Sequence, residues 1–287
     1  MQPSVDWSLR PLADMSPAEF HDWQALLEAR SGLVVSEQRR AFLQVNLSSR
    51  MREVGATDYA SYYQQVVSGP RGAVEWSALM DRLTVQETRF FRHPPSFAFL
   101  STYIRERCEQ REAPRPWSLW SVGCSSGEET YSLAITATEA LTGAGEVPIG
   151  VIGTDISLSA LARSREGIYA RRRLEHVGHE LRERYFQPLE ADRFQVVPSL
   201  AARVCFARLN VLELADAPMS NMDVIFCQNL LIYFRRWRRR EILNRLAERL
   251  APGGLLVIGV GEVVDWQHPD LEPVADNQVL AFTRKSL

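Results

Sequence analysis

The stretch WSLWSVGCSSGEE, residues 117–129, decides the fold class. Its first six residues are an apolar run of strand length, and Gly123 and Gly127 then precede an acidic pair, Glu128 and Glu129. Glycines let a backbone turn tightly and approach a ligand closely. The stretch matches neither a dinucleotide fingerprint nor a phosphate loop, so a plain strand–helix turn remains the alternative. The acidic pair favours a cationic ligand group over a phosphate.

Strand-like and helix-like segments alternate on both sides of this turn. We expect strands at 117–122, 149–154, 203–208, 222–227, 255–260 and 279–283, and helices at 127–141, 158–166 and 237–250. Near-continuous apolar strands separated by helices predict an α/β domain with a mostly parallel sheet covered on both faces. Residues 170–202 break this rhythm with a charged helix-like segment and a β-like piece at 193–197, which predicts a small β-containing insertion.

The first third of the chain has helical periodicity instead. Ser16, Pro17 and Glu19 form a helix start with a capping box, and Gly32 suits its end. Further helices are expected from Ser36, from Thr57 to the Gly69-Pro70 pair, at 73–83 and at 94–108. We therefore predict a small helical domain at 1–110, a polar linker at 111–116 (REAPRP) and the α/β domain at 117–287.

Composition limits the classes of function. The 287 residues are 46% hydrophobic and 24% charged, with a net charge of −2, so no overall attraction to nucleic acid or anionic membrane is expected. No apolar run approaches the ~20 residues that cross a bilayer, and no signal-peptide pattern opens the chain. Four cysteines and five histidines show no ligand spacing. These features predict a reduced, cytoplasmic protein without a metal site or membrane insertion.

The residues just after each strand are the candidates for chemistry. In an open parallel sheet, ligands bind at the carboxyl ends of the strands where the strand order reverses. Asp155 ends the second strand and could accept hydrogen bonds from both hydroxyls of a ribose, although a helix N-cap is the alternative role. A glycine turn followed by this acid suits a nucleoside, and an adenosyl-sulfonium fits better than a dinucleotide.

Three segments together are specific: TVQETRFFR at 84–92, WSVGCSSGEETYSL at 120–133 and DVIFCQNLLIYF at 223–234. With 155–169 and 250–261 in support, the chain resembles the CheR-type chemoreceptor glutamate methyltransferases nearly end to end, nearest the short type IV pilus branch (PilK-like). The resemblance implies a helical domain followed by a Rossmann-like class I methyltransferase domain. It also implies S-adenosylmethionine as cofactor, with S-adenosylhomocysteine as product.

The resemblance implies a role for each matching residue. Thr88 and Arg92 would reach the methionine carboxylate and the active site, Glu128 the ammonium group, and Asp155 the ribose. The remaining cofactor positions are Gln86, Gly123, Asn210, Val211, Asn229 and Leu230, and the catalytic ones are Arg92 and Tyr233. The family usually has Asn where Gln86 stands, which puts that contact in question. Phe90 and Phe91 are expected in the core.

The reaction implied suits a carboxylate acceptor. A glutamate side chain has a pKa of about 4.3 and is already ionised at neutral pH, so no general base is required. Positioning by residues such as Arg92 would then supply much of the acceleration. Enzymes that methylate amino groups often carry an Asn-Pro-Pro-Tyr turn where this chain has Asn229-Leu230-Leu231-Ile232, which argues against that class.

The resemblance implies the cytoplasmic helical bundle of a methyl-accepting chemoreceptor as partner. Five arginines in 235–240 could dock an acidic partner or bind phosphate, or form only a solvated helix start. The basic stretch 39–52 is a second candidate for receptor contact. Residues 188–203 contain no glycine, which favours an enzyme independent of a pentapeptide tether, and a monomer is expected. The alternatives are a silent cofactor-binding regulatory module and a small-molecule carboxyl methyltransferase.

Overall fold

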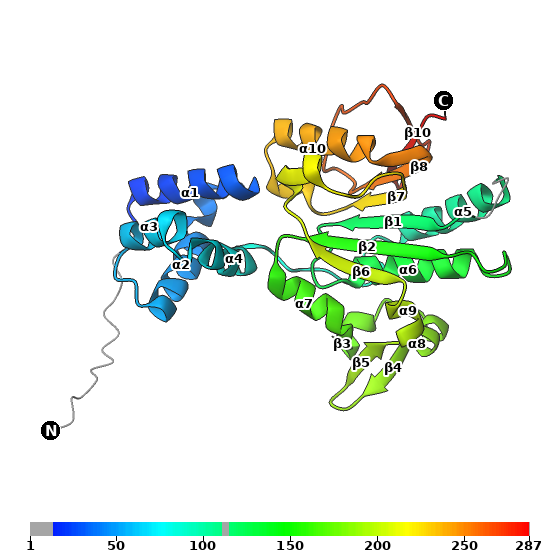
Figure 1. The fold of residues 1–287 in the computed structure, drawn as a ribbon, viewed down its shortest axis with the longest axis horizontal. Helices are drawn as coiled ribbons and strands as arrows, with labels where there is room; N and C mark the ends of the chain where they lie inside the picture. The colour runs from blue at the N-terminus through cyan, green and yellow to red at the C-terminus, as the bar shows by residue number, and fades with distance from the viewer. Residues whose placement is uncertain (1–13, 111–114, 287) are drawn as a thin grey trace. The chain divides into compact units, whose positions relative to one another are not determined.

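The computed structural model describes residues 14–110 and 115–286 (Figure 1). The chain divides into two compact units, Met1–Thr84 and Val85–Leu287. Within the described ranges, no helix is both long and apolar enough to span a bilayer.

The first unit is entirely helical. It contains α1 (Pro17–Ser31), the 3₁₀ turn η1 (Glu37–Arg39), α2 (Arg40–Val54), α3 (Tyr59–Ser68) and α4 (Gly72–Leu83). The predicted capping box is present, because Ser16 and Glu19 bond each other's backbone amides, and Gly32 ends α1 with φ +75°. Phe20, Trp23 and Leu27 are fully buried on one face of α1, as their helical spacing predicts.

The basic stretch 39–52 is partly used inside this unit. Arg50 donates from Nε and a terminal nitrogen to the two carboxylate oxygens of Glu75, at 2.9 and 2.8 Å. Tyr62 donates to the same carboxylate at 3.3 Å. A two-pronged arginine–carboxylate pair of this kind fixes both side chains. Arg50 therefore joins α2 to α4, and only the exposed remainder of the stretch, such as Arg52, can face a partner.

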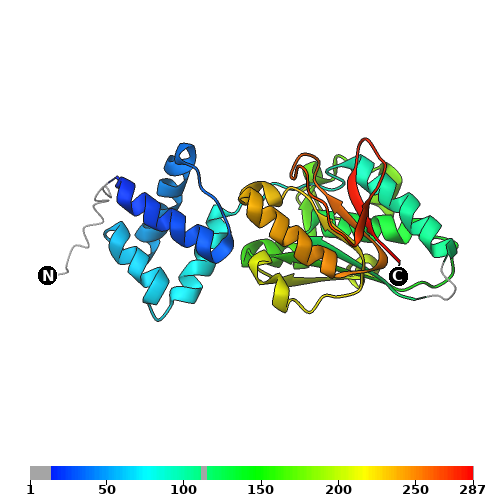
Figure 2. The same cartoon turned by 90° about the horizontal axis from the view of Figure 1, so that it is seen from above.

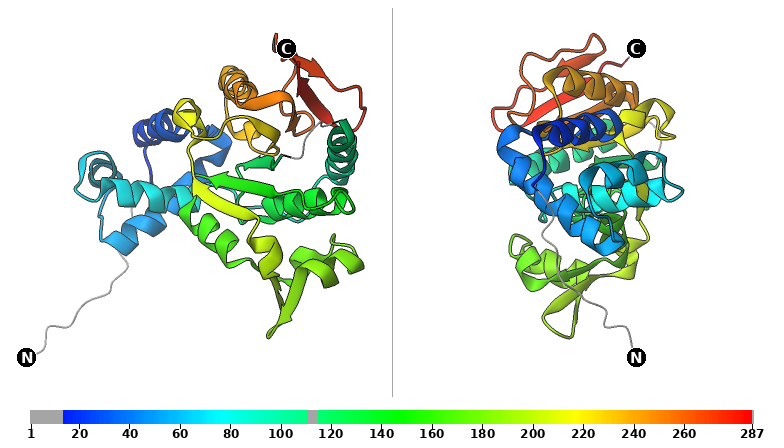
Figure 3. Two further views of the ribbon diagram at one scale, coloured as in Figure 1. Left: turned by 45° about the vertical axis from the view of Figure 1, so that its right-hand side comes forward. Right: turned by 90° about the vertical axis from the view of Figure 1, so that its left-hand side faces the viewer.

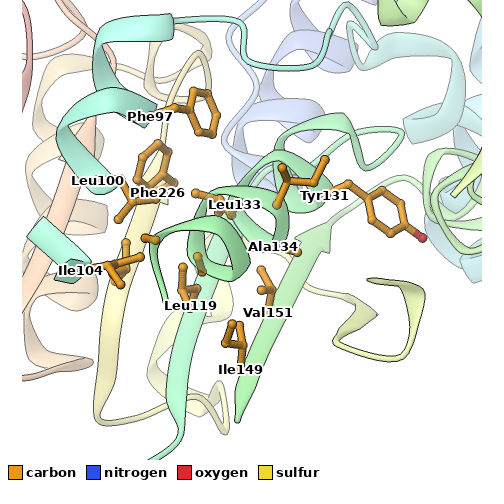
Figure 4. Packing of buried hydrophobic residues seen from close by; sticks show 14 of the residues in the cluster. Phe97, Leu100, Ile104, Leu119, Tyr131, Leu133, Ala134, Ile149, Val151 and Phe226 are labelled. Atoms are coloured by element: carbon orange, nitrogen blue, oxygen red, sulfur yellow. The ribbon is translucent and has the colours of Figure 1, made fainter. Parts of the chain in front are cut away.

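The boundary between the units differs from the expected one at residue 110. Helix α5 (Pro94–Gln110) belongs to the second unit, because Phe97, Leu100 and Ile104 are buried in the core of its sheet. Figure 4 shows these three side chains directed toward Phe226 and Leu119. Helical periodicity alone cannot say which domain a helix packs on. Of the predicted linker, residues 111–114 lie outside the described residues, and Arg115 pairs with buried Asp223 at 2.5 Å.

The second unit is built on a seven-stranded sheet of order β6-β2-β1-β7-β8-β10-β9. Its strands are β1 (Trp117–Val122), β2 (Ile149–Asp155), β6 (Val204–Arg208), β7 (Met222–Cys227), β8 (Leu250–Ile258), β9 (Leu271–Pro273) and β10 (Leu280–Arg284). The first five in spatial order are parallel, β10 pairs antiparallel with β8, and β9 pairs antiparallel with β10. All six predicted strands are present, and β9 is an addition. The strand order reverses between β1 and β7, where a ligand site is expected.

Side chains of each central strand alternate between two cores. Val224 and Phe226 of β7 face the core that includes α5 and α6 (Glu128–Ala140), whereas Ile225 and Cys227 face α10 (Arg236–Glu248). Figure 2 shows α5 and α10 on opposite sides of the sheet. A sheet covered on both faces explains why its strands are continuous apolar runs rather than alternating ones.

The predicted insertion forms a second, three-stranded sheet of order β3-β5-β4 (Figure 3). It includes β3 (Ile168–Ala170), η2 (Arg171–Leu174), α8 (His179–Tyr185), β4 (Phe186–Leu189), β5 (Arg193–Val196) and α9 (Pro198–Ala201), and it follows α7 (Leu158–Glu166). The β-like piece expected at 193–197 is β5, while β3 and β4 were not expected as strands. All the pairing in this sheet is antiparallel.

Candidate functional site

The glycine turn after β1 is held by the end of β2. The amides of Gly123 and Cys124 both donate to the Thr154 carbonyl, at 2.8 and 2.9 Å. Gly127 has φ +94°, and a Cβ there would lie 2.7 Å from the Ser164 Cβ, so only glycine fits. The turn thus brings the start of α6 close to α7. Both of its glycines are required by the backbone, as the sequence predicted.

Asp155 joins this turn to the next helix. One carboxylate oxygen accepts the Ser125 amide at 2.8 Å and the other accepts the Ser157 amide at 2.9 Å. The N-cap of α7 is Ser157, whose hydroxyl accepts the Ala160 amide, so the alternative of Asp155 as that N-cap is wrong. Asp155 is partly exposed, so its carboxylate is both fixed by backbone amides and open to solvent.

Glu128 is a buried carboxylate at the start of α6, with 1% of its side chain exposed. Ser126 donates its hydroxyl to one oxygen at 2.7 Å, and a terminal nitrogen of Arg173 lies 3.6 Å from the other. Burial raises the pKa of Glu128, and the hydrogen bond from Ser126 and the charge of Arg173 only partly oppose this. A positively charged ligand group would stabilise the ionised form further.

Arg173 connects the insertion to the predicted site. It stands in η2 and donates to the Thr88 carbonyl while it faces Glu128. Two predicted cofactor residues, Thr88 and Glu128, are therefore bridged by one guanidinium. Nothing in the run Arg171–Arg173 distinguishes this residue from its neighbours, so the sequence offered no signal for it.

The segment 86–92 lies along the same end of the sheet. Gln86 donates to the Ser157 hydroxyl at 3.1 Å and accepts from Arg163, so its amide is engaged beside the Asp155 loop. Arg92 is half-buried and donates to the Glu87 carbonyl at 2.7 Å. Phe90 is fully buried and Phe91 packs on the same core, as predicted.

The turn after β7 faces the turn after β1. The Leu230 side chain lies where a Cβ on Gly123 would be, at 3.0–3.3 Å, so Gly123 allows the two turns to approach. The conformation of the turn after β7 is held by Glu262, a residue that follows β8 and is 2% exposed. The Glu262 carboxylate accepts the Asn229 amide on one oxygen and the Leu231 amide on the other, the latter at 2.7 Å.

Glu262 holds a turn of the candidate site, and sequence reasoning missed it. Burial raises its pKa, while hydrogen bonds from the amides of Asn229, Leu231, Leu230 and Ile232 act in the opposite direction. Four successive backbone amides around one carboxylate form an anion-binding concavity within the chain. The available signal was the position of this acid, directly after an apolar strand and a glycine pair, where strand-end residues carry chemistry.

Strained backbone marks the same turns. Phe91, Ser125 and Asn229 have positive φ, at 50°, 50° and 58°. Asn tolerates this conformation better than most residues, whereas for Phe it is costly. The Phe91 amide donates to Ser132 in α6 at 3.0 Å, which helps to maintain the conformation. Such residues gather at functional sites, where the surrounding structure holds them.

Glu129, the second acid of the glycine turn, is half-buried and less enclosed than Glu128. It accepts the Ser121 hydroxyl at 2.7 Å. Its pKa is raised to about 7, mainly by burial and to a smaller extent by the nearby Glu262, while the Ser121 hydrogen bond and Arg92 act in the opposite direction. This network connects Arg92 with the Glu262 carboxylate beneath Asn229. The sequence indicated an acidic pair, but not that its two members differ in surroundings.

The remaining predicted residues lie at neighbouring strand ends. Asn210 caps the 3₁₀ turn η3 (Val211–Asp216) by accepting the Leu212 amide at 3.1 Å. The preceding residue, Leu209, donates to the Asp155 carbonyl at 3.0 Å, so Asn210 and Val211 follow directly beside Asp155. Tyr233 ends the turn η4 (Leu231–Tyr233) and is half-buried, with its amide 3.3 Å from the Leu230 carbonyl.

The arginine run 235–240 is divided by the fold. Arg239 donates to the carbonyls of Phe234 and Glu262, at 2.9 and 2.8 Å, and Arg238 pairs with Glu241 at 2.6 Å. Two of the five arginines are therefore structural or locally neutralised. Arg235, Arg236 and Arg240 are exposed. These three are therefore the arginines of the run that are most accessible to a partner or to solvent.

Comparison with known proteins agrees with this geometry. Residues 86–280 match the model "CheR methyltransferase, SAM binding domain" and residues 18–84 match "CheR methyltransferase, all-alpha domain". The chain is 35% identical to the chemotaxis protein methyltransferase of Klebsiella aerogenes, over 86% of this chain and 84% of that protein. It is 33% identical to the Escherichia coli chemotaxis protein methyltransferase, over 86% and 85% respectively. The chain therefore belongs to the CheR methyltransferase family.

Proposed function

We propose that this chain transfers the methyl group of S-adenosylmethionine to glutamate side chains of a chemoreceptor, giving glutamyl methyl esters. One observation carries the proposal. Two carboxylates, Asp155 at the end of β2 and the buried Glu128 just after β1, lie at the carboxyl ends of adjacent parallel strands in a chain of the CheR family. This pair suits a ligand that has both a ribose and a cationic amino group.

The residues present fit the cofactor. Asp155 is partly exposed and would accept the ribose hydroxyls, and Glu128 would receive the ammonium group, which would offset the cost of its burial. Thr88, Arg92 and Gln86 would face the methionine end, with Asn210 and Val211 beside the adenine. Gly123, Asn229 and Leu230 would line the pocket near the sulfur, since the two turns already touch.

The acceptor chemistry makes modest demands on the protein. Bound S-adenosylmethionine supplies a methyl group activated by its sulfonium charge. A glutamate carboxylate is an anion at neutral pH, so the chain must orient it rather than deprotonate it. Arg92 would position this carboxylate and Tyr233 would line its channel. A tight two-pronged grip by Arg92 would reduce nucleophilicity, and its bond to the Glu87 carbonyl keeps one nitrogen occupied.

The receptor's helical bundle is the partner that follows from this substrate. We expect the enzyme to work without a pentapeptide tether, because the stretch between β4 and β6 is short and residues 188–203 contain no glycine. We also expect a monomer. The resemblance to the type IV pilus branch also stays a prediction. The relatives, named chemotaxis protein methyltransferases, support a chemosensory role.

Methyl transfer to receptor-containing membranes tests the proposal. Labelled methyl from S-adenosylmethionine is expected on a receptor-sized band and is expected to be released as methanol by mild base, because esters hydrolyse where methylated amides and amines do not. Asp155→Ala should abolish the label. Asp192→Ala is the matched control, because Asp192 is an exposed aspartate of the insertion that pairs only with Arg171 among the described contacts. Base-stable label would contradict the ester, and unlabelled membranes would contradict the receptor substrate.

A further inference from the structure

Four large apolar side chains are exposed beside the candidate site. Ile232, Trp237, Val260 and Val264 are 49%, 55%, 63% and 70% exposed, and they come from two short segments that follow β7 and β8. Isolated exposed apolar residues are ordinary, but a group of them rimmed by polar residues marks an interaction surface. We call these four residues, with the exposed Arg235, Arg236 and Arg240, the strand-end surface.

The two segments are joined by hydrogen bonds from Arg239 and Arg240 to backbone carbonyls. Arg239 donates to the Ile232 and Phe234 carbonyls on one segment and to the Glu262 carbonyl on the other, at 3.4, 2.9 and 2.8 Å. Arg240 adds a bond to the Asp265 carbonyl at 3.2 Å. The strand-end surface is therefore preformed, and a partner would not have to order it on binding.

The charge of this surface is positive. Carbonyl partners leave the charge of an arginine in place, so Arg239 and Arg240 remain cationic contributors. Arg238 stacks over Trp237 at 4.2 Å and pairs with Glu241. Five arginines thus stand against three acidic residues, Glu241, Glu262 and Asp265, and one of these, Glu262, is buried. An acidic partner with an apolar stripe complements this arrangement.

The strand-end surface is continuous with the catalytic turn. Ile232 and Tyr233 are neighbours in η4, and Leu230 precedes them. We propose that the strand-end surface docks an acidic amphipathic helix of the methyl-accepting protein, with its apolar stripe on Trp237 and Val264 and its carboxylates on Arg236 and Arg240. Docking there places a glutamate of the helix beside Tyr233. This inference rests on the proposed function and adds where the substrate is recognised.

A nucleic acid is the competing occupant of an arginine-rich surface. Phosphate contacts need cations but gain little from exposed valines and isoleucine. Apolar anchors spaced for one face of a helix are instead the usual means of helix recognition. The apolar half of the surface therefore favours a protein helix.

Charge reversal tests the docking surface. In Arg236→Glu/Arg240→Glu, the KM for receptor-containing membranes is expected to rise about tenfold or more, with kcat and S-adenosylmethionine affinity unchanged. Arg105→Glu/Arg245→Glu is the matched control, because it makes the same change in charge at exposed positions on α5 and on the later turns of α10. Trp237→Ser tests the apolar half without a charge change, and its KM should rise about fivefold.

The outcomes separate this inference from the proposed function. If the wild-type enzyme esterifies receptors but the variants have the same receptor KM as the control, the docking surface is overturned and the proposed function stands. Wild-type enzyme that labels no receptor overturns both. An unchanged receptor KM with lost binding to a duplex DNA probe assigns the arginines to nucleic acid instead. Unchanged cofactor affinity in the variants establishes that they are folded.

Discussion

The two turns that face each other at the reversal point of the sheet are held in different ways. The turn after β1 is fixed by the adjacent strand end, through the Thr154 carbonyl and the Asp155 carboxylate. The turn after β7 is fixed by a side chain from beyond the next strand, the buried carboxylate of Glu262. The first arrangement keeps a partly exposed carboxylate at the turn, whereas the carboxylate of the second is buried within the protein.

This difference separates binding from support. Asp155 is partly exposed and Glu262 is buried, although each accepts two backbone amides. The Glu262 carboxylate is surrounded by the amides of its own turn, whereas part of the Asp155 side chain faces solvent. We infer that Asp155 acts on the cofactor directly and that Glu262 acts through the position of Asn229 and Leu230. Variants of the two turns should therefore fail in different measurements.

Removal of Glu262 should have the largest effect. Glu262→Ala leaves the Asn229 and Leu231 amides without their acceptor. It also removes the carboxylate that packs closely against the Gly259 backbone. The free energy of unfolding is expected to fall by about 4 kcal/mol, as measured by urea denaturation. Glu262→Gln keeps one acceptor oxygen and should lose less.

Glu272→Ala, an exposed glutamate on β9, is the control and should be neutral. The same preparations report on catalysis, where Glu262→Gln should lower kcat more than it weakens cofactor binding. An equal loss in kcat and in cofactor affinity would mean that Glu262 is part of the binding site and does not act only by supporting the turn.

The glycine turn can be broken by a single methyl group. Gly127→Ala forces φ +94° on a residue with a Cβ and drives that atom to 2.7 Å from Ser164, so a loss of about 3 kcal/mol is expected. Gly143→Ala is a matched control, since Gly143 has φ +88° with open space around it. It should lose only about 1 kcal/mol. Equal losses in urea denaturation would show that the close packing of α6 on α7 contributes nothing.

Asp155→Asn should mainly change ligand affinity. The amide keeps one acceptor oxygen but presents a donor to either the Ser125 or the Ser157 amide. We expect the Kd for S-adenosylhomocysteine, measured by calorimetry, to rise by about 30-fold, or about 2 kcal/mol. Asp192→Asn serves as the control. A Kd within twofold of the wild type would remove Asp155 from the cofactor site.

The contrast between the turns also explains what the sequence could predict. Trp117–Val122 and Met222–Cys227 were predicted to the residue, because strands buried on both faces are uninterrupted apolar runs. Asp155 was identified because it ends such a run. Glu262 lies 33 residues beyond the Asn229 amide that it binds, and one sequence does not show that pairing. The packing of α5 on the sheet was missed for the same reason.

The smallest expected effect is the pH dependence that Glu129 gives to the free energy of unfolding. Burial raises the pKa of Glu129 to about 7, above its ordinary value of 4.5. Between these two values the unfolded chain releases the proton first, so ionisation of Glu129 lowers the stability of the fold as pH rises through this window. Glu129→Gln keeps the acceptor for Ser121 and removes the ionisation. Its stability relative to the wild type should therefore increase by about 1–2 kcal/mol between about pH 5 and about pH 8. Urea denaturation at both pH values measures this, with Glu272→Gln as the exposed control. A pH-independent difference would mean that Glu129 is ionised throughout, and that Arg92 outweighs its burial.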